Sequence, residues 1–230
     1  RQNLIAAYIT RLFLKGGFEI VQQPGGSKPQ MLVKDLPDTA AQDDDNDTKL
    51  ESELHSFIKE AAGDDRILQK NELRRWSKYN GRTLYAWSNR IENGATVWTM
   101  KPEEVRQVFG LRKFLKDFTL IKDRGVVEVK LWNDYLVFAS LYGIADQVMR
   151  DFRKVCPEYF RLSSSAEFFN DSATNLLIWD MINMTSRDFS VAASTYEASL
   201  NRSSSSGGGG SSSWGGGGGY SGGGSGGGGR

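Results

Sequence analysis

The chain has 230 residues, a length that allows one domain or two small ones. Its 29 basic and 28 acidic residues leave a net charge of +1, so no global field draws the protein to nucleic acid or anionic lipid. The single cysteine, Cys156, excludes an intrachain disulfide framework, and the longest apolar run, residues 135–145, is shorter than the roughly 20 residues of a membrane helix.

Residues 1–34 predict a helix followed by a hairpin. Apolar residues recur at helical spacing from Leu4 to Phe13, and Gly16-Gly17 ends the helix. Strands are expected at 18–22 and 30–34, joined by a turn rich in Pro and Gly. A helix that runs straight into a hairpin forms the back half of a winged-helix unit. We therefore expect a partial winged-helix-like unit at residues 1–34.

The chain opens inside a helical pattern at Arg1, with no initiator methionine, no signal segment and no helix cap. The sequence therefore reads as a fragment of a longer protein, with the front helices of the winged-helix-like unit upstream of Arg1.

Residues 35–48 are acidic and nearly free of large apolar groups, so a solvated linker is expected there. Residues 50–100 predict a three-helix unit, with helices at 50–62, 69–79 and 82–92, and this unit could form a second winged-helix-like module. His55, the one histidine of the chain, lies beside the apolar face of the first of these helices, and we expect it at the surface or the edge of the core.

Residues 101–185 predict a helical domain. Pro102 and the two acids after it form a favourable first turn for a helix that ends near Phe118. The side of this helix expected to be buried carries Val105, Val108, Phe109, Leu115 and Phe118. A second helical stretch is expected from 127 to 155, with a break near Gly143, and a third from 166 to 184.

Residues 186–230 are expected to be a linker and a tail. From Ser203 onward the chain contains only Gly and Ser apart from Trp214, Tyr220 and Arg230, and such a segment cannot offset the entropy of ordering. The predicted fold class is thus mainly α with a small β-hairpin (α+β): a winged-helix-like unit, a helical domain and a disordered C-terminal tail.

No phosphate-binding loop, metalloprotease helix motif or CxxC pair is present, and we expect no catalytic residue, no cofactor and no metal site. An enzyme remains an alternative hypothesis, in which Asp117, Asp134 and Asp146 would line a cleft and perform acid-base chemistry.

The densest basic cluster comprises Arg74, Arg75, Lys78 and Arg82, with Trp76 and Tyr79 between them. It is the best local candidate for a surface that binds an acidic partner or nucleic acid. A solvated helix face is the simpler interpretation of the same residues.

Residues 110–160 carry motifs of a known family. A Phe-Leu-x-Asp-Phe segment contains Phe114, Leu115, Asp117 and Phe118, and a Trp-x-x-Tyr-Leu segment contains Trp132, Tyr135 and Leu136. Gly143, Ile144 and Ala145 complete the pattern. In order and spacing this stretch resembles the predicted bacterial membrane proteins of domain of unknown function 2207, which typically end in a similar serine-glycine tail. We expect the motif residues to be core positions rather than a ligand site.

The resemblance implies a signal sequence, an extracytoplasmic domain and a membrane helix upstream of Arg1, with this chain on the cytoplasmic side of a bacterial cell membrane. It carries over no catalytic residues. We expect a non-enzymatic interaction module whose partner is a protein rather than nucleic acid. The alternatives are a nucleic-acid-binding winged helix that uses the Arg74–Arg82 cluster and an enzyme with a carboxylate site. The sequence leaves the oligomeric state open.

Overall fold

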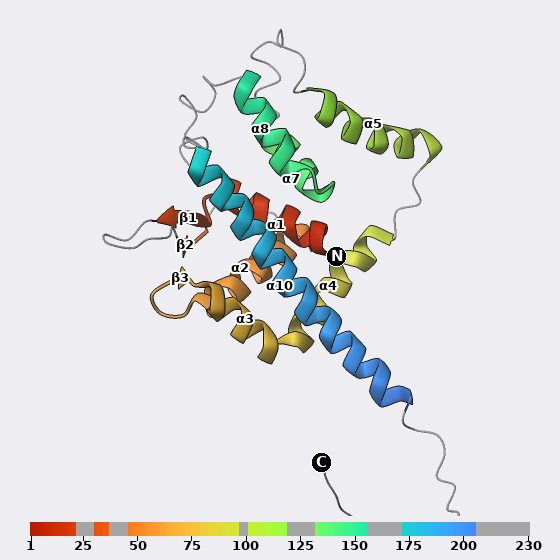
Figure 1. Ribbon diagram of the computed structural model, residues 1–230. Coiled ribbons are helices and arrows are strands. Elements are labelled where there is room, and N and C mark those ends of the chain that lie inside the picture. The colour runs from red at the N-terminus through yellow and green to blue at the C-terminus, as the bar shows by residue number, and fades with distance from the viewer. Residues whose placement is uncertain (22–29, 37–45, 97–100, 119–131, 156–171, 206–230) are drawn as a thin grey trace, which may run out of the picture.

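The computed structural model describes residues 1–21, 30–36, 46–96, 101–118, 132–155 and 172–205. These residues are mainly helical and carry one small antiparallel sheet (Figure 1), as the sequence predicts. The elements in chain order are α1 (Gln2–Leu14), β1 (Phe18–Val21), β2 (Gln30–Val33), α2 (Asn46–Ala62), β3 (Ile67–Leu68), α3 (Lys70–Tyr79), α4 (Gly81–Thr96), α5 (Pro102–Phe118), α7 (Trp132–Leu141), α8 (Ala145–Val155) and α10 (Ser172–Ser205).

The predicted helix and hairpin at the start of the chain are confirmed. Gly16 has a φ of +77°, the left-handed conformation that ends α1 without steric cost. Strands β1 and β2 pair antiparallel, with Phe18 opposite Val33. The sheet has a third strand, β3, which pairs with β2 and which the sequence did not reveal because it is only two residues long. The winged-helix-like detail stays a prediction.

The three helices expected between residues 50 and 100 are also confirmed as α2, α3 and α4. The predicted linker at 35–48 is wrong at its end, because α2 begins at Asn46; residues 37–45 lie outside the described residues.

At the start of the predicted linker, Asp35 forms ion pairs with Lys59 and Arg66 at 2.8 and 2.6 Å. These two cations lower the pKa of Asp35 to about 2, with the Arg66 hydrogen bond as the larger cause.

Helix α5 begins as predicted, and the Lys101 backbone N–H donates to the Glu104 carboxylate at 2.8 Å. The predicted burial of its apolar residues is wrong for three of them. Leu115 is fully buried, but Phe109 is 70% exposed and Val105 and Val108 are each 36% exposed. The reason is geometric: only the last turns of α5 lie against α7 and α8, so the first turns have no helix to pack on (Figure 1).

The expected break at Gly143 is confirmed, since Gly143 adopts a φ of +68° between α7 and α8.

The expected linker from residue 186 is wrong, because α10 continues to Ser205 and includes the first residues of the predicted tail. Buried residues recur along α10 every three or four positions, which makes a continuous stripe, and they are Ile178, Ile182, Thr185, Phe189 and Ala193. Because the stripe contains polar and small residues, the hydropathy of the sequence did not reveal it. Residues 206–230 lie outside the described part of the chain.

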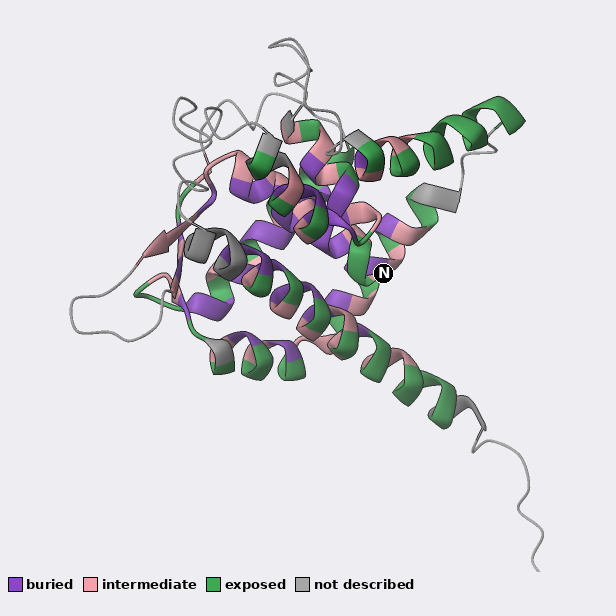
Figure 2. Ribbon diagram, turned by 45° about the horizontal axis from the view of Figure 1, so that its top comes forward, coloured by how far each residue is buried: buried purple, intermediate pink, exposed green. Residues whose placement is uncertain are grey.

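One hydrophobic core joins all of these elements, including parts that the sequence assigned to separate units. Helix α1 is its centre: it packs against α2, α7 and α10, and Ile9 and Leu12 are completely buried. Figure 2 shows buried residues concentrated where these helices face one another and exposed residues along the outer side of α10.

Buried polar side chains tie the helices together at specific points. The Thr10 hydroxyl of α1 lies 2.8 Å from the Ser140 hydroxyl of α7, and the Ser140 hydroxyl also donates to the Leu136 carbonyl. The Trp87 indole N–H donates to the Leu50 carbonyl at 2.9 Å. Buried polar groups that are satisfied in this way define one arrangement of the helices among the several that apolar packing would allow.

His55 holds the hairpin against α2. Its Nε2 donates to the Lys34 carbonyl at 2.8 Å, and its ring stacks on Phe18 with centroids 5.6 Å apart. His55 is buried, so the expected surface position is wrong. Burial lowers the pKa of His55 below its ordinary value of 6.5, and the hydrogen bond to Lys34 opposes this only in part.

The lowered pKa predicts a pH dependence of stability. Unfolded His55 binds a proton more readily than the folded residue, so its contribution to stability is complete above pH 6.5 and is lost as the pH falls through the folded-state pKa. We expect the free energy of unfolding of the native chain to fall more steeply between about pH 7 and pH 5 than that of His55→Gln. Urea titrations at a series of pH values measure this difference. Equal slopes in the two proteins would contradict the assignment.

Leu136, a motif residue of α7, is fully buried. We therefore expect Leu136→Ala to lower the free energy of unfolding by about 2–5 kcal/mol. Phe138→Leu, two positions away at a site that is 41% exposed, is the matched control and should change stability by less than about 0.5 kcal/mol. Denaturant unfolding of the three proteins tests the pair. A similar small effect of both substitutions would show that the motif does not stabilise the core.

Candidate functional site

A groove lies between α3, the start of α4 and the outer face of α10. Its volume is about 690 Å³, which is in the usual range for binding pockets. Helix α3 contributes residues spaced three or four positions apart, namely Asn71, Arg74, Ser77 and Lys78, together with Tyr79 at its end. The α10 wall consists of Arg187, Asp188, Val191, Ala192, Thr195, Tyr196 and Ser199.

The groove exists because α10 crosses both α3 and α4. Gly81 begins α4 at the point of closest approach, where a Cβ atom would lie 3.3 Å from Tyr196 Cβ and 3.4 Å from the Ala192 carbonyl. A side chain there would press on Tyr196 and on the α10 backbone, which would have to shift slightly. Further along, Trp76 packs edge-on against Phe189 with centroids 6.0 Å apart. Together these contacts pack α10 against α3 and the start of α4, the elements that line the groove.

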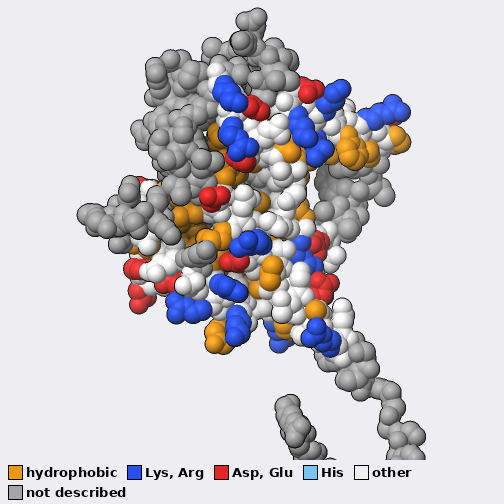
Figure 3. Space-filling view, viewed as in Figure 1, with side chains coloured by type: hydrophobic (Ala, Val, Ile, Leu, Met, Phe, Trp, Pro, Cys, Tyr) orange, Lys and Arg blue, Asp and Glu red, His pale blue; other side chains and the backbone are white. Residues whose placement is uncertain are grey.

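Four basic side chains line the groove against one acid, Asp188. Three of them, Arg74, Lys78 and Arg82, form no ion pair with any residue that the structure describes. The fourth, Arg187, lies 3.7 Å from Asp188 and is 62% exposed. Figure 3 shows blue side chains gathered over α3 and the adjoining part of α10. The groove is therefore a positively charged surface with an excess of cations.

Apolar surface accompanies this charge. Tyr79 is 83% exposed and Val191 is 58% exposed, so two large apolar side chains of the groove face solvent. Ser77 lines the inner wall, where its hydroxyl is buried and has no hydrogen-bond partner within the described ranges. Charged, aromatic and aliphatic groups thus occur together, a composition common in surfaces that bind peptides and proteins.

The structure brings together three of the four residues of the basic cluster identified in the sequence. Arg74, Lys78 and Arg82 line the groove, whereas Arg75 points elsewhere on α3 and donates to the Asn71 carbonyl at 3.3 Å. Trp76 lies between these basic residues in the sequence. Its side chain is partly buried, and its indole N–H donates to the Glu60 carboxylate at 3.1 Å. Sequence reasoning missed Arg187 and the rest of the α10 wall, since α10 lay in the segment predicted to be a linker.

The family motif residues lie in the packing of α5, α7 and α8. Phe114 and Tyr135 meet edge to face with centroids 5.8 Å apart, and Leu115 and Leu136 are fully buried. Ile144 and Ala145 are buried beside the Gly143 turn, and Asp117 is exposed. The side chains of Phe118 and Trp132 lie outside the described residues. In the part of the motif that is described, the apolar residues have a structural role.

The three carboxylates of the enzyme hypothesis do not share the groove. Asp117 and Asp134 are exposed, and Asp146 pairs with Arg150 at 2.7 Å within α8. Among the described residues, no three His, Cys, Asp or Glu side chains are grouped so that they could hold a metal ion. Cys156 lies outside these ranges. In the same part of the chain, none of the helices combines the length and apolar character needed to cross a membrane.

Comparison with known proteins gives one finding. A search of curated proteins found no match, and a search of solved structures likewise found none. One family model matches residues 98–152, which include α5, α7 and most of α8. Its description is "Predicted membrane protein (DUF2207) C-terminal domain". The resemblance expected from the sequence is therefore confirmed, and residues 98–152 match the C-terminal domain of this family of predicted membrane proteins.

Proposed function

We propose that this chain is a non-enzymatic interaction module on the cytoplasmic side of a membrane-attached bacterial protein, and that it binds an acidic segment of a protein partner in the α3–α10 groove. The observation that carries the proposal is the groove itself, where Arg74, Lys78 and Arg82 have no ion-pair partner in the described structure and stand beside exposed apolar side chains.

The charge of the groove favours an acidic ligand. Cations that are close together repel one another, and a carboxylate placed between them relieves this repulsion and gains charge-assisted hydrogen bonds. Arg74 and Lys78 lie four positions apart on α3, which is about one helical turn. Their donors can therefore contact acidic groups spaced along a bound segment. Complementary charge of this kind contributes more to selection of the partner and to the association rate than to affinity.

The apolar groups favour protein over nucleic acid. Tyr79 and Val191 give a peptide side chain a surface to cover, whereas a phosphate backbone would gain nothing from Val191 and would meet Asp188. Attachment to a membrane would raise the effective concentration of partners in the same membrane, so moderate affinity would suffice.

The groove predicts which residues a partner contacts. A photoreactive amino acid in place of Tyr79 should cross-link to the partner in cells of the native host. Arg74→Glu combined with Lys78→Glu should reduce the cross-linked product at least about tenfold, since two attractive charges become repulsive ones. Mass spectrometry of the cross-linked product should place the attachment in a segment rich in Asp and Glu.

Arg75→Glu is the control, because it reverses one charge on the same helix outside the groove, and it should leave the cross-link intact. Circular dichroism of each variant checks that the helices are retained. A cross-link that survives the double reversal would contradict the proposal. Micromolar binding of random duplex DNA that weakens steeply with salt and is lost in the double variant would instead establish a nucleic-acid surface.

A further inference from the structure

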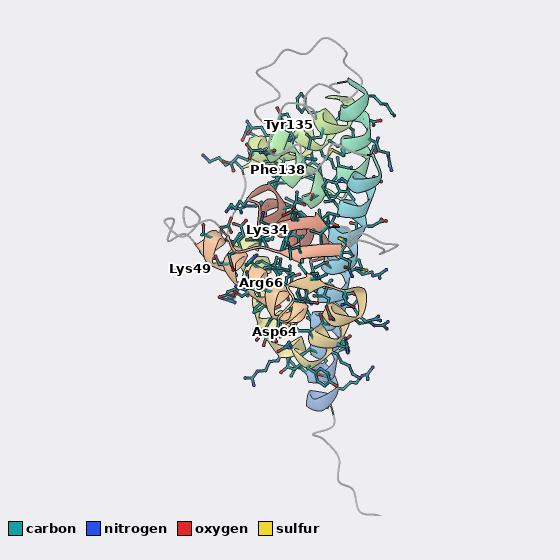
Figure 4. All side chains as sticks on the ribbon, turned by 90° about the vertical axis from the view of Figure 1, so that its left-hand side faces the viewer. Lys34, Lys49, Asp64, Arg66, Tyr135 and Phe138 are labelled. Atoms are coloured by element: carbon teal, nitrogen blue, oxygen red, sulfur yellow. The ribbon has the colours of Figure 1, made fainter. Side chains whose placement is uncertain are left out.

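We propose that the exposed face of α5 contacts an anionic lipid surface, with Phe109, Val105 and Val108 at the lipid and basic side chains beside them. This surface is separate from the α3–α10 groove. Helix α5 lies with α7 and α8 at one end of the molecule, and α3 lies at the other (Figure 1). Figure 4 shows the same separation from the side, with Tyr135 and Phe138 of α7 far from Asp64 near α3.

The apolar part of this face is formed by three residues in the first half of α5. Phe109 is 70% exposed, and Val105 and Val108 are each 36% exposed. They lie three or four positions apart, so they occupy one side of the helix. Figure 3 shows orange side chains on α5 next to blue ones.

Two basic residues of α5 share the angular range of its exposed apolar residues. At 100° per residue, Arg112 falls between Val105 and Val108 in angle, and Lys116 falls between Val105 and Phe109. Lys113 borders this side beyond Phe109 and Glu104 borders it beyond Val108, each at about 40°, whereas Arg106, Asp117 and Glu103 lie further round the helix. The side that carries Val105, Val108 and Phe109 therefore also carries two cations, a combination found in helices that lie in a membrane interface.

The last turns of α5 are packed on neighbouring helices, whereas residues 102–110 are exposed on every side of the helix. Leu115 is fully buried, Phe114 packs against Tyr135, and the Tyr142 hydroxyl donates to the Val108 carbonyl at 2.7 Å. These contacts hold α5 on α7 and leave Val105, Val108 and Phe109 exposed.

A lipid surface fits this face better than a protein does. A stable protein interface needs roughly 800 Å² from each partner, and three apolar side chains supply only part of that area. A surface-bound helix needs only shallow insertion together with attraction between basic residues and anionic headgroups. The family match to predicted membrane proteins covers α5, so a membrane would be close to this face in the full-length protein.

Vesicle binding tests the proposal. The purified chain should sediment with vesicles that mix phosphatidylcholine and phosphatidylglycerol, bind much less to pure phosphatidylcholine, and dissociate as salt rises. Phe109→Glu should weaken binding to the mixed vesicles about tenfold, and Arg112→Glu should weaken it several-fold and flatten its salt dependence. Both residues are exposed, so thermal unfolding should be unchanged.

Val191→Glu is the control, since it places the same charge at an exposed apolar residue of α10 in the other surface. It should leave vesicle binding unchanged, while the α5 variants should leave the Tyr79 cross-link unchanged. No binding to mixed vesicles, or binding that Phe109→Glu does not weaken, overturns the proposal. A dimer that Phe109→Glu converts to a monomer would assign the face to a second copy of the chain instead.

Discussion

The fold depends on the burial of α1. Helix α1 packs against α2, α7 and α10, which approach from different directions, and its apolar residues extend around most of its circumference. An isolated helix of this length and character would be unstable in water, so α1 forms because the other helices cover it. The Thr10–Ser140 contact and the Lys15–Glu51 ion pair then determine how α7 and α2 are placed on it.

This central helix also determines where surfaces are left uncovered. Because α10 is long enough to cover α1 and then continue past α3 and α4, its outer side and α3 enclose the groove. At the other end, α7 connects α1 to α5, but α7 and α8 meet only the last turns of α5. The charged groove and the exposed face of α5 both arise where a helix extends beyond the elements that it covers.

The two surfaces have different chemistry, which suggests different partners. The groove combines three cations that have no ion pair within the described residues with an aromatic and an aliphatic residue on two facing walls, and it can enclose a chain segment. The α5 face lies on one helix and carries a few exposed apolar side chains with basic ones among them. A protein held at a membrane by one end could use both at once, since each contact raises the effective concentration for the other.

The sequence by itself determined the helices, the hairpin, the turn at Gly143 and the motif that matches residues 98–152, because periodicity, glycine turns and motif spacing are local properties. It also identified the basic residues of α3. Only the tertiary structure decided that Val105, Val108 and Phe109 are exposed, that residues 186–205 are helical, and that Arg187 joins Arg74 and Lys78 in one groove. Each of these depends on which helix lies opposite, and in α10 the stripe that makes the contact contains Thr185 and Ala193, whose low hydropathy gives no local signal.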